Sequence, residues 1–118
     1  MKISESAEMY LETILILSKK GDVHAIDIVR AMNFSRPTVS VAIHNLEKEK
    51  LVKISDEDHI TLEPAGREIA EKIYERHTVL TSLLVKLGVS EKVAAEDACK
   101  MEHDISEETF DCIKKHIL

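Results

Sequence analysis

Residues 25–48 read AIDIVRAMNFSRPTVSVAIHNLEK, and this stretch decides the fold. Asn33 stands where a residue that tolerates the left-handed conformation can end a helix. Ser35 can cap a following helix, and Pro37 falls in the first turn of that helix, where its missing N–H costs nothing. The pattern predicts a helix over about 25–32, a short turn and a second helix from near Arg36. Together these elements form a helix-turn-helix.

The second helix of this pair has an apolar face and an opposite face of mostly small polar residues. The positions predicted to point inward are Val39, Ala42, Ile43 and Leu46. Those predicted to point outward are Arg36, Thr38, Ser40, Val41, His44, Asn45 and Lys48. Because the second helix of such a motif enters the major groove, the candidate DNA-binding residues are Ser35, Arg36, Pro37, Thr38, Ser40 and Val41. A solvated helix start is the alternative interpretation of Arg36 and Thr38.

The segments on either side complete a winged helix. Residues 5–18 have helical apolar spacing, with Ala7, Leu11, Ile14 and Leu15 on one face. Residues 51–55 and 59–62 alternate with a period of two around an acidic turn at 56–58, as a β-hairpin does. The order helix, helix, helix, hairpin is typical of a winged helix-turn-helix.

The rest of the chain is predicted to be helical. A long helix is expected from Pro64 to about Leu87, where Gly88 ends it, followed by helices over 90–103 and 106–117. We therefore expect a mainly α fold with a two-stranded wing. Its predicted domains are residues 1–63, which bind DNA, and residues 64–118, an all-helical unit.

Composition excludes several classes of protein. The chain has 118 residues, 44% of them hydrophobic and 32% charged, which fits a folded globular protein. Without an apolar run of 18 residues or an apolar leader, neither a membrane span nor a secretory signal is expected, and the predicted location is the cytoplasm. Two cysteines, Cys99 and Cys112, are too few for a disulfide framework.

The net charge of −6 is unusual for a DNA-binding protein. Residues 1–67 carry nine basic and eleven acidic side chains, whereas residues 68–118 carry seven and eleven. Residues 36–53 hold four basic and two acidic side chains, so the predicted reading helix and first strand are locally positive. An acidic protein whose charge is reduced by bound divalent cations is compatible with metal-switched DNA binding.

Metal-ligand residue types recur on three of the predicted helices. Cys99, Glu102 and His103 fall within one arc of the helix over 90–103. Met9 and Glu12 are separated by three residues on the first helix, and His77 lies on the apolar side of the long helix. Taken singly, each has an ordinary interpretation as a core residue or a solvated charge. Spacing alone leaves the metal and the structural interpretations equally open.

Several motifs resemble the diphtheria toxin repressor family, which also includes the manganese transport regulator. They are Phe34-Ser35-Arg36-Pro37-Thr38-Val39-Ser40, Leu62-Glu63-Pro64-Ala65-Gly66-Arg67, Arg76-His77 and Ala98-Cys99-Lys100-Met101-Glu102-His103. The likeness runs from about Ala7 to the C-terminus with collinear spacing. It implies a homodimeric repressor that a divalent metal activates to bind a palindromic DNA operator and control metal-homeostasis genes.

The resemblance also implies the ligands. Met9, Cys99, Glu102 and His103 match the principal metal site, and Glu12 and His77 match further metal-site positions. Met9 and Cys99 resemble the iron-responsive branch, whereas the manganese branch carries carboxylates at both places. Thioether and thiolate also suit Fe²⁺ better than Mn²⁺, although Zn²⁺, Co²⁺ and Ni²⁺ would bind such a set. Fe²⁺ is therefore the first choice of activator. A metal bound by ligands from both predicted domains would fix the angle between these domains. In a dimer it would thereby fix the spacing of the two recognition helices.

The sequence departs from the family pattern at some positions. Thr81 and Ala95 stand where the iron branch has further ligands, and Glu96 is a candidate substitute. The chain stops before the SH3-like third domain that some members of the family append, so no such domain is expected. Val41 stands where the family often has a polar residue. Dimerisation is predicted to use the C-terminal helices and their apolar residues Val85, Val93, Phe110, Ile113 and Ile117.

The sequence leaves three alternative functions to weigh against an Fe²⁺-activated repressor. The first is a regulator of the same family that responds to Mn²⁺ or Zn²⁺. The second is a winged helix that binds another protein, or a small organic ligand, without metal. The third is an enzyme, which is not expected, because no G-x-S-x-G, P-loop or H-E-x-x-H motif accompanies the candidate ligands.

Overall fold

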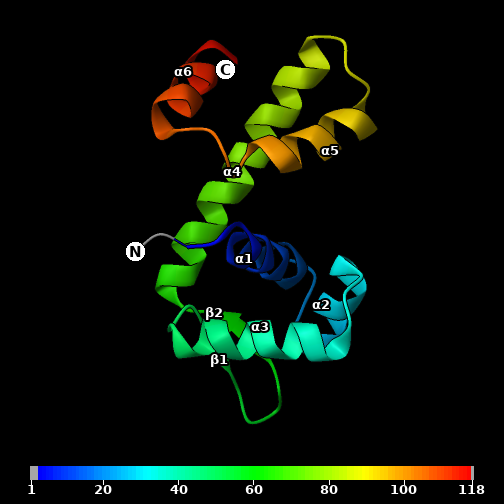
Figure 1. Ribbon diagram of the computed structural model, residues 1–118, viewed down its shortest axis with the longest axis vertical. Coiled ribbons are helices and arrows are strands. Elements are labelled where there is room, and N and C mark those ends of the chain that lie inside the picture. Colours follow the sequence, from blue (N-terminus) through cyan, green and yellow to red (C-terminus); the bar gives the residue numbers. More distant parts are fainter. Residues whose placement is uncertain (1–2, 118) are drawn as a thin grey trace. The chain divides into compact units, whose positions relative to one another are not determined.

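The computed structural model describes residues 3–117 and is mainly helical, with one two-stranded antiparallel sheet among them (Figure 1). Its elements are α1 (Glu5–Ser18), α2 (Ala25–Met32), α3 (Arg36–Lys48), β1 (Val52–Ile54), β2 (Ile60–Leu62), α4 (Pro64–Lys86), α5 (Glu91–Met101) and α6 (Glu107–Ile117). They form two compact units that divide within α4, between Glu71 and Lys72. The predicted domain division after residue 63 stays a prediction.

The core of the first unit is built on α1. The hydroxyl of Ser4 accepts a hydrogen bond from the Ala7 amide and so caps the helix. Leu11, Ile14 and Leu15 are buried on the predicted face, which confirms the expected periodicity. Their burial removes apolar surface from water and holds α1 against α2, α3 and β2.

The helix-turn-helix forms as the local signals predict. The backbone of Asn33 is left-handed, with φ of 57°, and ends α2. Ser35 caps α3 by accepting a hydrogen bond from the Thr38 amide at 3.3 Å. Val39 and Ile43 are buried on one face of α3, as is Leu46, while the predicted outward positions are exposed. The predicted orientation of α3 is therefore confirmed.

The wing is a hairpin with shorter strands than predicted. Val52 pairs with Leu62 and Ile54 pairs with Ile60. The last paired residues of the ladder are Ile54 and Ile60. Beyond them the Ser55 amide donates to the His59 carbonyl at 2.9 Å, and the Ser55 hydroxyl accepts hydrogen bonds from the amides of Glu57 and His59, which closes the acidic turn. The Ile60 amide donates to the Val23 carbonyl, so the segment before α2 adds a contact along β2.

The second unit contains α4 from Lys72 onward, α5 and α6. Gly88, with φ of 104°, lies just past the end of α4, as predicted. In Figure 1, the turn after α5 (orange) leads to α6 beside α4. The Lys114 ammonium lies 2.9 Å from the Glu75 carboxylate, and Lys86 donates to the Ile117 carbonyl at 2.9 Å. These surface contacts fasten α6 to α4.

Phe110 does not belong to the predicted dimerisation surface. Its side chain is only 5% exposed, and its ring lies under the guanidinium of Arg76. An apolar position on an amphipathic helix has the same sequence pattern whether it faces the core or a partner. The expectation that Phe110 contributes to an intersubunit surface was therefore wrong, and this residue is part of the core of the second unit.

Candidate metal centre and DNA-binding helix

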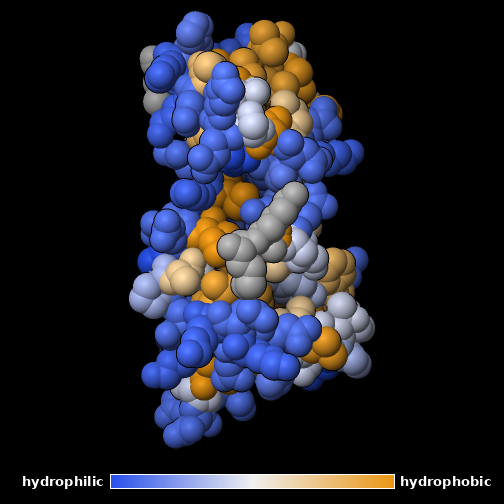
Figure 2. Space-filling view, turned by 60° about the vertical axis from the view of Figure 1, so that its left-hand side comes forward, coloured by the Kyte–Doolittle hydropathy of each residue, from blue (hydrophilic) through white to orange (hydrophobic). Residues whose placement is uncertain are grey.

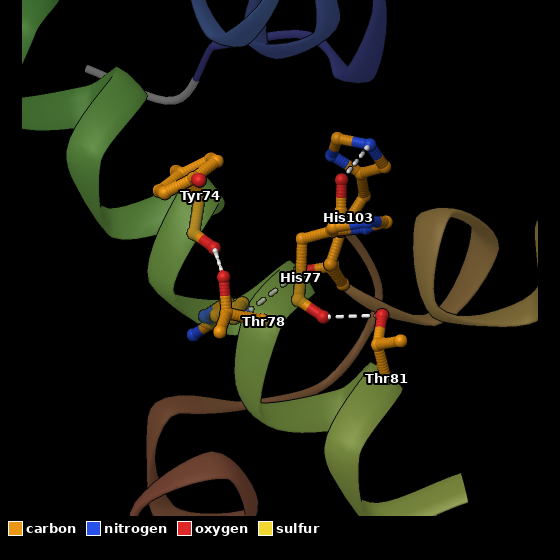
Figure 3. A network of polar contacts seen from close by, with 7 residues as sticks. Tyr74, His77, Thr78, Thr81 and His103 are labelled. Atoms are coloured by element: carbon orange, nitrogen blue, oxygen red, sulfur yellow. Dashed lines mark hydrogen bonds and ion pairs between the residues drawn. The ribbon is translucent and has the colours of Figure 1, made fainter. Parts of the chain in front are cut away.

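The second unit buries a carboxylate against an imidazole. Glu102 is 0% exposed, and its Oε2 lies 2.9 Å from Nδ1 of His77 on α4. Burial of a lone carboxylate is costly unless cations or hydrogen-bond donors compensate its charge. The backbone carbonyl of His77 accepts a hydrogen bond from the Thr81 hydroxyl at 2.7 Å (Figure 3). Thr81, which stands where the iron branch has a further ligand, therefore bonds to its own helix.

A second imidazole lies on the other oxygen of the same carboxylate. Nε2 of His103 is 3.5 Å from Oε1 of Glu102, and the His103 side chain is 2% exposed. Two imidazoles and one carboxylate supply the nitrogen and oxygen ligands that Zn²⁺, Fe²⁺ and Mn²⁺ accept. The residues present therefore fit a divalent transition metal. The structure brings together His77, Glu102 and His103, and their role as ligands stays a prediction.

The helix that carries these ligands is shorter than predicted. α5 ends at Met101 instead of His103, because the Asp104 amide bonds to the Met101 carbonyl and tightens the last turn. Glu102 and His103 therefore lie in the turn that follows α5. Cys99 remains on α5, three residues before Glu102, as a half-buried thiol that forms no disulfide.

The predicted ligands of the first unit lie on α1. Met9 is half-buried, and Glu12 is 8% exposed, which is unusual for a carboxylate on a surface helix. Their spacing of three residues within α1 places them on adjacent turns of the same helix, as expected. Their role as ligands likewise stays a prediction.

Arg76 is a residue near the site for which sequence reasoning gave no role. Its Nη1 donates to the backbone carbonyls of Glu102 and Ile105, at 3.0 and 2.8 Å. The contact spans 26 and 29 residues of sequence, so no local periodicity could indicate it. The one available signal was a cation placed directly before His77 in a helix whose neighbouring turns are apolar.

The start of α3 presents the candidate DNA-binding residues to solvent. Ser35, Arg36, Pro37, Thr38 and Ser40 are all exposed, and Val41 is 63% exposed. The Ser35 hydroxyl is committed to the helix cap, since it contacts both the amide and the hydroxyl of Thr38. An exposed arginine at a helix N-terminus, where the dipole is positive, is suited to contact phosphate or guanine.

An exposed recognition helix with a wing, joined to a helical unit that buries a carboxylate between two imidazoles, defines a class of winged-helix regulators with a metal-binding helical unit. Residues 2–60 match the iron dependent repressor N-terminal DNA binding domain. Residues 63–117 match the iron dependent repressor metal binding and dimerisation domain. The chain belongs to the iron dependent repressor family and is a metal-dependent transcriptional repressor.

Named relatives agree with this assignment. The chain is 32% identical to the transcriptional regulator MntR of Escherichia coli O157:H7 over 111 residues, which are 93% of this chain and 72% of that protein. It is 31% identical to the diphtheria toxin repressor of Corynebacterium glutamicum over 106 residues, 88% of this chain and 46% of the repressor. A solved manganese-dependent transcriptional repressor in complex with manganese has a TM-score of 0.85 and 26% identity, covering 94% of this chain and 52% of its own.

Among the described residues, no helix has the length and apolar character needed to cross a membrane. The family is one of DNA-binding transcriptional regulators.

Proposed function

We propose that this protein is an Fe²⁺-activated repressor that binds a palindromic operator as a homodimer and controls genes of metal homeostasis. The observation that carries the proposal is the fully buried Glu102 carboxylate between the imidazoles of His77 and His103. A bound divalent cation supplies the positive charge that compensates a carboxylate in such a position. Metal binding would therefore stabilise the arrangement of the turn that follows α5.

The proposed ligand set is completed from the family resemblance. Cys99 and His103 join Glu102 and Met9 in the principal site, and Glu12 and His77 hold further positions. The set draws on α1 in the first unit and on α4, α5 and the following turn in the second. Loading with metal would thereby control DNA binding.

Fe²⁺ is preferred to Mn²⁺ because of the sulfur ligands. Thiolate and thioether favour softer ions, whereas Mn²⁺ prefers carboxylate and water. We expect Fe²⁺ to half-activate DNA binding at a lower free concentration than Mn²⁺ in anaerobic, metal-buffered titrations. The probe is a palindromic duplex enriched from a random DNA pool by the metal-loaded full chain, and binding is followed by fluorescence anisotropy. Activation by Mn²⁺ at the lower free concentration would reverse the assignment.

A manganese-responsive repressor is the second candidate. Its support comes from the aligned solved structure, which is a manganese-dependent transcriptional repressor in complex with manganese. The imidazole and carboxylate ligands of the second unit accept Mn²⁺ as well as Fe²⁺. The titration above distinguishes the two candidates, and including Zn²⁺ tests a zinc-responsive regulator in the same series.

The proposed dimer surface lies on the second unit. Exposed apolar side chains occur on α4 and α5, with Val85 38% and Val93 45% exposed. A shallow apolar groove of about 280 Å³ lies between α4 and α6, lined by Leu83, Cys112, Ile113, His116 and Ile117. Figure 2 shows orange, apolar atoms grouped on part of the second unit among blue, polar ones. A second copy of the chain would cover these side chains, as the family's dimerisation domain implies.

Replacing Arg36 by alanine is expected to weaken DNA binding about tenfold or more, because a strong base or phosphate contact is worth about 1–3 kcal/mol. The measurement is the anisotropy titration of the enriched duplex with metal in excess. Lys48→Ala is the matched control, since it removes the same charge from the exposed face at the other end of α3. An equal loss in both variants, or no loss in Arg36→Ala, would contradict the placement of the α3 N-terminus on DNA.

A further inference from the structure

The turn after α5 carries two proposed ligands but lies outside the regular helix. α5 ends at Met101, and the Glu102 amide makes the last i to i−4 hydrogen bond of the helix, to the Ala98 carbonyl. The carbonyls at a helix C-terminus have no partners within the helix. The positions of Glu102 and His103 therefore depend on what holds the backbone of this turn.

Arg76 of α4 supplies that support. A single nitrogen, Nη1, donates to the carbonyl of Glu102 at 3.0 Å and to the carbonyl of Ile105 at 2.8 Å. A cation at the C-terminal end of a helix is stabilised by the helix dipole. The guanidinium is itself held in place, because its central carbon lies 5.3 Å from the centre of the Phe110 ring on α6. Arg76 thus joins α4, the turn after α5, and α6.

Two consecutive residues of α4 hold the same glutamate. Arg76 bonds to the backbone carbonyl of Glu102, and His77 bonds to its carboxylate at 2.9 Å. The hydrogen bond to the Glu102 carbonyl fixes the backbone from which the Glu102 side chain projects. The same peptide group leads into His103, so the position of His103 is fixed as well. A shift of the turn would move both proposed ligands away from His77.

We propose that Arg76 is a positioning residue for metal binding, which holds the turn at residues 102–105 so that Glu102 and His103 face His77. The proposal rests on the proposed metal-binding function. Arg76 is not a ligand, because a guanidinium has only donors and stays charged. Groups that orient metal ligands typically change metal affinity about 10- to 100-fold when they are removed.

The test is Co²⁺ binding to the full chain, followed by the visible absorption of the bound ion, for wild type, Arg76→Leu and Arg76→Lys. We expect Arg76→Leu to lower Co²⁺ affinity about 10- to 100-fold and to change the absorption bands. Arg76→Lys keeps the cation and is expected to recover part of the affinity. Circular dichroism and thermal unfolding of the metal-free chains monitor folding. If Arg76→Leu does not fold, Arg76→Lys tests the proposal by itself, and the expected result is a lower Co²⁺ affinity with altered absorption bands.

Two further variants separate the possible outcomes. Lys114→Met removes the surface contact with Glu75 between α6 and α4 and leaves the turn alone, so it is expected to bind Co²⁺ like wild type. Loss of affinity equal to that of Arg76→Leu in this variant would overturn the positioning role. Wild-type Co²⁺ affinity and bands in the Arg76 variants, with loss in Glu102→Gln, would also overturn it. Unchanged binding in Glu102→Gln would instead contradict the proposed function.

Discussion

Glu102→Gln is expected to lower divalent-metal affinity by at least about 100-fold and to abolish metal-dependent DNA binding, while the chain stays folded. The substitution keeps the size of the side chain but removes the anionic oxygens that lie near Nδ1 of His77 and Nε2 of His103. Loss of a group that merely orients a ligand already costs about 10- to 100-fold in affinity, so loss of a ligand itself costs more.

The metal-free fold is expected to survive this change. A neutral amide is cheaper to bury than a carboxylate, and Glu102 is 0% exposed. Metal affinity is measured by competition with a chromophoric chelator, and folding by circular dichroism. Glu108→Gln provides the control, because Glu108 is exposed in the first turn of α6. Metal-dependent DNA binding at wild-type strength in Glu102→Gln would contradict the site.

Gly66→Ala is expected to destabilise the winged unit by about 3 kcal/mol, the upper part of the usual range for overpacking. A Cβ at this position would overlap the Leu51 carbonyl oxygen and lie 2.9 Å from the carbonyl carbon. The Leu51 carbonyl cannot easily move aside, because it accepts a hydrogen bond from the Glu63 amide at 3.0 Å. The gain of about 1 kcal/mol in helix propensity from glycine to alanine does not offset this clash.

Urea unfolding followed by circular dichroism measures the change for Gly66→Ala. Glu68→Ala, at an exposed position of the same helix, is the matched control and is expected to change the free energy of unfolding by less than about 0.5 kcal/mol. A Gly66→Ala chain as stable as wild type would show that the close approach of α4 to the segment before β1 is not required.

The winged part of the fold could be predicted because its signals are local. Asn33, Ser35 and Pro37 fix the end of α2 and the start of α3 through preferences of single residues, and each plays the expected part. The strands were predicted one or two residues too long, since alternation continues to Ser55, whereas its hydroxyl already closes the turn. Boundaries of this kind depend on side-chain hydrogen bonds that periodicity does not report.

The residue types of the candidate site could be predicted from the sequence, whereas the contacts that hold these residues in place could not. Helical spacing placed Glu102 and His103 near Cys99. The apolar position of His77 indicated that its side chain faces inward, and its contact with the buried Glu102 agrees with this. The end of α5 at Met101 depends on a local hydrogen bond from the Asp104 amide, which periodicity does not report. The contact of Arg76 with the following turn and the burial of Phe110 depend on packing between segments far apart in the sequence, which helical spacing alone cannot locate.

The central claim is that a divalent metal bound through the buried Glu102 cluster controls DNA binding. The most direct test is the affinity of the full wild-type chain for the enriched palindromic duplex, measured anaerobically by fluorescence anisotropy with Fe²⁺ and again after chelation with EDTA. The account predicts tight binding with metal, loss of that binding on chelation and recovery when metal is restored. Equal affinity for the duplex before and after removal of the metal would contradict it.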